Sequence, residues 1–141
     1  MRKVLLILLA SMASLAGYCR IPYRILDASP ADTTEACISF NESKISLGTI
    51  NKDTTPKVPV TFRFTNKGRK PLVIHNVQAS CGCTTVEYPH HPIMPGAQDS
   101  LSVVYDSRRA SGGKFQKSIA VYTNGQTETT YIYIEGSVSE Q

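Results

Sequence analysis

Residues 58–64 read VPVTFRF, and this stretch decides the fold. Two valines and two phenylalanines alternate in it with proline, threonine and arginine. Because successive side chains of an extended chain point to opposite faces, the alternation predicts a β-strand with one buried face and one solvated face. The same period of two recurs in residues 100–105, 118–122 and 131–138.

Turn-forming residues separate these apolar stretches. Asn, Asp, Pro and Gly favour tight reversals, and they occur at residues 51–53, 66–68, 95–96, 112–113 and 124–125. About seven short strands, with turns roughly every 8 to 12 residues, predict an all-β domain with an immunoglobulin-like two-sheet β-sandwich. A closed barrel is the alternative arrangement.

In one predicted strand, the apolar residues do not all fall on the same face. Leu72 and Ile74 share one parity, whereas Val77 and Ala79 fall on the other. A regular strand cannot bury all four side chains, so we expect a β-bulge near Asn76.

The first residues have the pattern of a secretory signal. Arg2 and Lys3 precede an apolar run at residues 4–10, and small residues follow. We therefore expect a signal peptide over residues 1–16, with cleavage after Ala16. The run is shorter than the roughly 20 apolar residues that a membrane-spanning helix needs, so the sequence predicts export to the periplasm, outer membrane or cell surface.

Cys19 raises the alternative of a lipid anchor. Residues 15–17 read LAG, as in the lipobox of bacterial lipoproteins, but Tyr18 separates them from the cysteine. Acylation of Cys19 is the only membrane attachment that we expect. Residues 17–36 show no sustained periodicity and are expected to form a tether, leaving residues 37–139 as the domain.

Composition limits the function classes. A chain of 141 residues with 41% hydrophobic residues can build one modest core, which argues against a multidomain enzyme. The formal net charge is +4, and two of the basic residues lie in the predicted signal. No basic stripe is present, so we expect no binding to nucleic acid.

The most reactive local motif is Cys81-Gly82-Cys83, and three uses of it compete. Two thiols two residues apart on an extended strand point to the same side, and Gly82 lets the backbone bend. The pair could be a redox-active disulfide, or it could bind Cu or Zn together with His75, His90 or His91. It could also be structural, either as two small half-buried residues at a bulged strand end or with one thiol paired to Cys37.

The histidines and other polar residues do not nominate a catalytic set. His90 and His91 lie between Pro89 and Pro92, which favours a solvated extended loop. His75 falls on a predicted outward face. Since no nucleophile with an adjacent base is evident, we expect that the protein is not an enzyme. We also expect no resident cofactor, except for Cu or Zn if the cysteines and histidines bind a metal.

Three tyrosines are predicted to share the outer face of a sheet. Tyr131 and Tyr133 alternate with inward isoleucines, and Tyr122 lies opposite Val121 in parity. Tyrosine suits recognition because it combines a rigid ring with a hydrogen-bonding tip, although strand propensity alone also enriches it. We therefore consider Tyr122, Tyr131 and Tyr133 a candidate surface for an envelope protein or glycan.

Several segments together resemble a known family. They arrive in order as FRFTNKG (62–68), PLVI (71–74), SCGCT (80–84), PIMPG (92–96), VYD (104–106) and GKF (113–115). The chain resembles the bacterial domain of unknown function fifteen seventy-three over roughly residues 37–139. The resemblance implies an exported immunoglobulin-like sandwich of the major sperm protein group, and it implies no particular activity.

Two hypotheses about function follow. The first is an exported, non-enzymatic immunoglobulin-like interaction or structural module of the bacterial cell envelope. The second is a periplasmic thiol-redox or copper- or zinc-binding protein that uses Cys81 and Cys83, with His90 or His91 as further ligands.

Overall fold

The computed structural model describes residues 35–139. The predicted signal peptide at residues 1–16, the candidate lipidation site Cys19 and most of the predicted tether lie outside the described residues. Within residues 35–139, no helix is long and apolar enough to cross a membrane.

The described chain is built from eight β-strands and one short 3₁₀ helix. They are β1 (Ile38–Phe40), β2 (Lys44–Asn51), β3 (Lys57–Asn66), β4 (Ile74–Ala79), β5 (Thr84–Glu87), β6 (Gln98–Asp106), η1 (Ser107–Arg109), β7 (Gly113–Thr123) and β8 (Thr129–Ser139).

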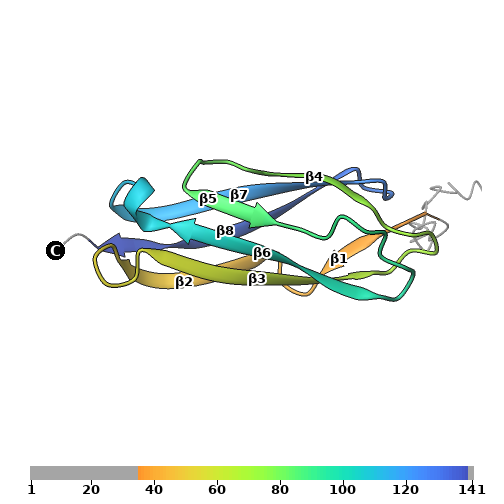
Figure 1. Ribbon diagram of the computed structural model, residues 1–141, viewed down its shortest axis with the longest axis horizontal. Coiled ribbons are helices and arrows are strands. Elements are labelled where there is room, and N and C mark those ends of the chain that lie inside the picture. Colours follow the sequence, from red (N-terminus) through yellow and green to blue (C-terminus); the bar gives the residue numbers. More distant parts are fainter. Residues whose placement is uncertain (1–34, 140–141) are drawn as a thin grey trace, which may run out of the picture. The chain divides into compact units, whose positions relative to one another are not determined.

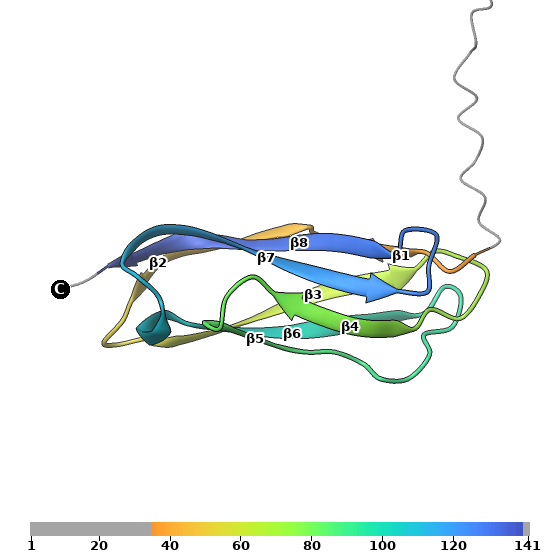
Figure 2. The same cartoon turned by 90° about the horizontal axis from the view of Figure 1, so that it is seen from above.

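The strands form two sheets of four, in the orders β1-β3-β6-β5 and β2-β8-β7-β4. Figure 1 and Figure 2 show the strands of both sheets running along one common direction. The prediction of an all-β, immunoglobulin-like two-sheet sandwich is confirmed. There are eight strands instead of about seven because the first part of the chain forms an edge strand in each sheet. β1 pairs antiparallel with β3, and the chain then crosses to the other sheet, where β2 runs parallel to β8.

The VPVTFRF stretch forms the centre of β3, and its apolar face builds the core. Val60, Phe62 and Phe64 are buried, and the register places Phe62 opposite Leu101 of β6. The facing sheet contributes Ile119, Val121, Ile132 and Ile134, each 0% exposed. The side chains that we expected to point inward on these strands are therefore the buried ones.

The β-bulge predicted near Asn76 is confirmed. The pairing of β4 with β7 shifts register between Ile74 and Asn76. The shift lets Val77 and Ala79 pack against the core as Ile74 does. Leu72, before the strand, is fully buried and forms an isolated bridge with Ile93.

One buried polar side chain joins three separate segments at one end of the sandwich. The Asn66 amide nitrogen donates to the carbonyl oxygens of Lys70 and Ile93, at 2.8 and 2.9 Å. Its Oδ1 accepts from the backbone N–H groups of Cys37 and Gly68, at 3.2 and 3.0 Å. Asn66 is 0% exposed, so these four bonds replace all the water that the amide would otherwise bind.

The backbone around Asn66 leaves no room for a side chain at Gly68. A methyl group there would come within 2.6 Å of the Ala36 Cα and would overlap the carbonyl oxygen of Glu35. Ala36, which we expected in the tether, is 1% exposed and its carbonyl oxygen accepts from the Gln126 N–H. The ordered sandwich therefore includes the residues just before Cys37.

A second buried polar group has no partner. Tyr105 is 0% exposed and stacks on Phe115, with ring centroids 4.3 Å apart. Its hydroxyl makes no hydrogen bond within the described structure. Burial raises the pKa of Tyr105 above its ordinary value of 10.0 because the phenolate would lose its hydration.

We predict that Asn66→Asp lowers the free energy of unfolding by about 3 kcal/mol or more, because a carboxylate cannot donate to the two carbonyls and would be buried with its charge. Urea unfolding followed by circular dichroism measures the change. The exposed Asn76→Asp is the matched control, with an expected change within about 0.5 kcal/mol. Equal effects of the two variants would contradict the role given to Asn66.

We predict that Tyr105→Phe leaves the free energy of unfolding unchanged or raises it by about 1 kcal/mol, since the variant removes a buried hydroxyl without a partner. Above pH 10 the unfolded chain ionises Tyr105 while the native chain keeps its proton. Wild-type stability therefore falls as pH rises through the native pKa, and this contribution is absent from Tyr105→Phe. Urea midpoints from pH 8 to 11 test both statements, and a loss of stability at pH 8 would refute the first.

Candidate functional site

The Cys81-Gly82-Cys83 motif lies in the link that carries the chain from one sheet to the other. It joins β4, an edge strand of one sheet, to β5, an edge strand of the other. We expected the two cysteines on an extended strand, and this expectation is wrong: residues 80–83 form a turn. The turn is needed because the chain has to leave one layer, and the Thr84 N–H closes it by donating to the Cys81 carbonyl oxygen at 3.3 Å.

Cys81 and Cys83 form a disulfide within this turn, with their Cα atoms 5.2 Å apart. Cys37 is the free cysteine of the described residues, so the alternative pairing with Cys37 is not formed. Burial differs between the bonded pair: Cys83 is 6% exposed, whereas Cys81 is half-buried.

The hydroxyl of Thr84 lies within reach of both sulfur atoms. Its Oγ1 is 3.4 Å from the Cys81 Sγ and 4.0 Å from the Cys83 Sγ. A hydroxyl in this position can donate to whichever sulfur carries negative charge. The turn therefore contains both a reactive bond and a group that can stabilise a thiolate.

Gly82 does not act as the sequence suggested. Its φ is not positive, since the positive values among the described residues belong to Gly48, Gly96 and Gly113. A methyl group added at Gly82 would meet no atom within 4 Å. The bend is therefore open to other residues, and the effect of glycine here is to leave the space beside the disulfide empty.

None of the candidate histidines has a described contact with Cys81 or Cys83. The His90 ring lies 4.5 Å from the Tyr88 ring, centroid to centroid. His91 is exposed, and its Nε2 lies 3.1 Å from the Asp99 carboxylate. His75 is exposed on β4, as its parity predicted.

The residues proposed as metal ligands are not assembled into one site. Among residues 35–139, no group of three or more His, Cys, Asp and Glu side chains is placed to hold a metal ion. The disulfide also removes the two thiolates that a soft metal would need. The structure thus brings Cys81 and Cys83 together and leaves His90 and His91 out of their surroundings.

The three candidate tyrosines share the outer face of the β2-β8-β7-β4 sheet. Tyr131 is 53% exposed, and Tyr122 and Tyr133 are half-buried. The register sets Tyr131 opposite Ala120 and Tyr133 opposite Ser118. Ala120 points outward and is nevertheless only 8% exposed, so larger neighbours cover it. We call Tyr122, Tyr131 and Tyr133, with Ser118 and Ala120 between them, the tyrosine face.

An ion pair borders the tyrosine face. Lys44 lies next to Tyr133 in the register of β2 with β8, and its Nζ is 3.3 Å from the Glu135 carboxylate. Both side chains are well exposed, so the pair adds polarity at the rim and little stability.

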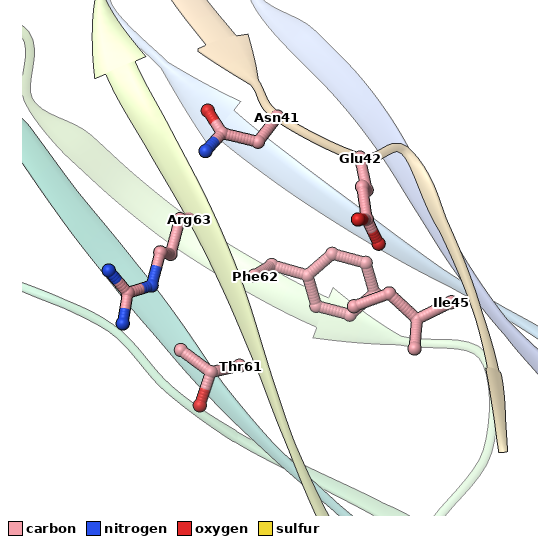
Figure 3. Close-up of a pocket in the computed structure, with 6 residues that line it drawn as sticks. All are labelled: Asn41, Glu42, Ile45, Thr61, Phe62 and Arg63. Atoms are coloured by element: carbon pink, nitrogen blue, oxygen red, sulfur yellow. The ribbon is translucent and has the colours of Figure 1, made fainter.

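A small pocket that the sequence did not predict lies where the chain crosses from β1 to β2. Its volume is about 230 Å³, and it is lined by Asn41, Glu42, Ile45, Thr61, Phe62 and Arg63. Figure 3 shows Arg63 and Thr61 on one side of β3 and Phe62 on the other, with Ile45 beside the Phe62 ring. The parity of VPVTFRF placed Arg63 outward, but no sequence pattern indicates that Asn41 and Glu42 approach β3.

The lining of this pocket offers groups for polar recognition. It presents a carboxylate, a guanidinium, an amide and a hydroxyl around an apolar floor.

Comparison with known sequences gives one match. A family described as "Protein of unknown function (DUF1573)" matches residues 38–138. No curated protein matches the chain.

Comparison with solved structures gives many matches at low sequence identity. A protein of unknown function from Porphyromonas gingivalis W83 is similar with a TM-score of 0.65 and 17% identity, over 77% of this chain and 50% of that one. The chain thus spans half the length of that protein. A PapD-like domain of human CEP192 has a TM-score of 0.57 and 10% identity, over 74% and 86%. The periplasmic chaperone SfaE has a TM-score of 0.52 and 8% identity, over 74% and 58%.

We predict opposite outcomes for alanine at two glycines. Gly82→Ala should change the free energy of unfolding by no more than about 0.5 kcal/mol, or raise it slightly, because φ is ordinary and the space is open. Gly68→Ala should lower it by about 2 kcal/mol or more, because backbone atoms occupy the position of the new methyl group. Urea unfolding of both variants measures this, and a destabilised Gly82→Ala would show that glycine is needed for the bend.

Proposed function

We propose that this chain, which belongs to the DUF1573 family of proteins of unknown function, is an exported, non-enzymatic binding module of the bacterial cell envelope. The observation that carries the proposal is the tyrosine face. We further propose that its partner is a protein.

The tyrosine face has the composition of a recognition surface. Tyr131 is the most exposed large aromatic side chain among residues 35–139. Tyrosine buries a large apolar area at a low cost in side-chain entropy, and its hydroxyl retains a hydrogen bond in the complex. Tyr122 and Tyr133 are half-buried, so they lose less side-chain freedom on binding than fully exposed side chains would.

The arrangement of the face favours a protein partner over a glycan. Protein interfaces place aromatic side chains at the centre and charged or polar side chains at the rim. Here Tyr131 and Tyr133 lie on β8, one of the two central strands of the sheet, and the Lys44–Glu135 pair lies at one border. A ring at the centre of such a face becomes fully desolvated on binding, which is typical of energetic hot spots.

Export is supported by the signal pattern in the first residues. The sandwich also resembles that of SfaE, which is described as a periplasmic chaperone, and this likeness concerns the fold. An acylated Cys19 would hold the domain at a membrane surface through the residues that precede Glu35.

We predict that the purified domain binds saturably to the envelope fraction of its own host and that Tyr131→Ala weakens this binding at least about tenfold, because truncating a central aromatic ring at an interface is costly. Co-sedimentation isotherms provide the measurement. Ser102→Ala, an exposed change on the other sheet, is the matched control and should bind like the wild type.

Pretreatment of the envelopes identifies the class of partner. Protease treatment should abolish binding, and digestion of envelope glycans should leave it intact. Equal binding by Tyr131→Ala and wild type would overturn the tyrosine face as the binding surface. Binding that survives protease and disappears on glycan digestion would overturn the protein partner.

A further inference from the structure

We propose that the Cys81–Cys83 disulfide is a redox-exchange site that oxidises a dithiol, with Cys81 as the sulfur that is attacked. This activity goes beyond the binding role, because it uses different residues and has its own readout. Four observations support it: the short loop, the unequal burial of the two cysteines, the empty space at Gly82 and the anchoring of the turn.

The loop closed by the disulfide is too short for the bond to act mainly as a stabiliser. The two cysteines are separated by only 2 positions in the sequence. The entropy that a cross-link removes from the unfolded chain grows with the length of the closed loop, so this bond removes little. The core beneath it is built from buried side chains of both sheets, with Cys83 as one member of a large cluster.

Burial makes the two sulfur atoms unequal. Cys81 is half-buried and can be approached from solvent, whereas Cys83 is 6% exposed. Gly82 between them is exposed and has no atoms in the place of a side chain. An incoming thiolate therefore has access to Cys81 and leaves Cys83 as the departing sulfur.

The turn is fixed at both ends, so the two thiols stay close after the bond breaks. Before it, the Ser80 N–H donates to the Ser118 carbonyl oxygen at 2.9 Å, and the Ser118 N–H donates to Ser80 Oγ at 3.1 Å. After it, the Cys83 carbonyl oxygen accepts from the Asp106 N–H at 2.8 Å. Held in this way, the two thiols can re-form the disulfide at high effective concentration.

The exchange proceeds in two balanced steps. A thiolate of the dithiol attacks Cys81 Sγ, which forms a mixed disulfide and releases Cys83 as a thiolate beside the Thr84 hydroxyl. The second thiol of the dithiol, after losing its proton, attacks its own partner sulfur in the mixed disulfide and releases Cys81. Two electrons pass to the cysteine pair, the dithiol becomes a disulfide, and its two protons end on Cys81 and Cys83.

The first test uses a variant chain in which Cys19 and Cys37 are replaced by serine, so that Cys81 and Cys83 are its only cysteines. The oxidised protein is mixed with dithiothreitol or with a reduced Cys-x-x-Cys peptide, and free Cys81 and Cys83 are counted by alkylation and mass spectrometry. We expect both probes to reduce the pair in the native state, and a faster reaction with the peptide would indicate a protein substrate.

The melting temperature should differ between oxidised and reduced forms by no more than about 7 °C. A pair that is reduced only on unfolding, or a larger shift, would overturn the proposal in favour of a structural bond.

The second test compares Cys83→Ser with its matched control Cys81→Ser in the same background. Each variant lacks the disulfide and retains one thiol. Because position 83 is buried and position 81 is half-buried, circular dichroism of both variants first establishes that each is folded. We expect the remaining Cys81 to react with dithiobis(nitrobenzoate) at least about tenfold faster than the remaining Cys83, because reactivity follows access to the thiolate. Equal or reversed rates would overturn the assignment of Cys81. Neither outcome depends on Tyr131, so failure here leaves the envelope-binding proposal untouched.

Discussion

The sandwich depends on the side chain of Asn66. Its four hydrogen bonds satisfy backbone groups of the segment that begins β1, of the turn after β3 and of the loop before β6. Without that amide, these groups would be buried without partners at one end of the core. Two of the segments that carry the family resemblance, FTNKG and PIMPG, meet here, so this part of the signature maintains the fold. The SCGCT segment lies at the link between the two sheets, where its disulfide closes a short turn.

Much of the fold could be predicted because a strand with one buried face leaves a period of two in the sequence. That period predicted the inward residues of β3, β6, β7 and β8, and the change of parity after Ile74 predicted the bulge. The division of the first edge into β1 and β2 could not be predicted, since three residues such as Ile38–Phe40 are too few to show a period. The role of Asn66 was also hidden. Asparagine beside glycine is typical of an exposed turn, and the carbonyl of Ile93 that it binds comes from a distant loop.

The candidate site was predictable in part for the same reasons. Parity placed Tyr131 outward, and the presence of two nearby thiols identified Cys81 and Cys83 without revealing the turn that joins them. The turn follows from tertiary structure, because β4 and β5 end in different sheets. The proximity of histidine and cysteine in the sequence was a poor guide to a shared site, since β5 separates His90 and His91 from the turn and they contact Tyr88 and Asp99 instead.

The register also relates the two functional proposals in space. Ser80 hydrogen-bonds to Ser118, and Ser118 lies opposite Tyr133 in the pairing of β7 with β8. The turn that contains the disulfide is therefore about two strand spacings, or roughly 10 Å, from the nearest ring of the tyrosine face. A protein partner that covers a face of standard size would extend beyond that distance. Binding and thiol exchange can thus act on the same partner while using separate residues. The disulfide turn adjoins Asp106 at one end of β6, whereas Asn66 adjoins Ala97 at the other, so the turn can change in sequence without the loss of the hydrogen bonds that Asn66 makes.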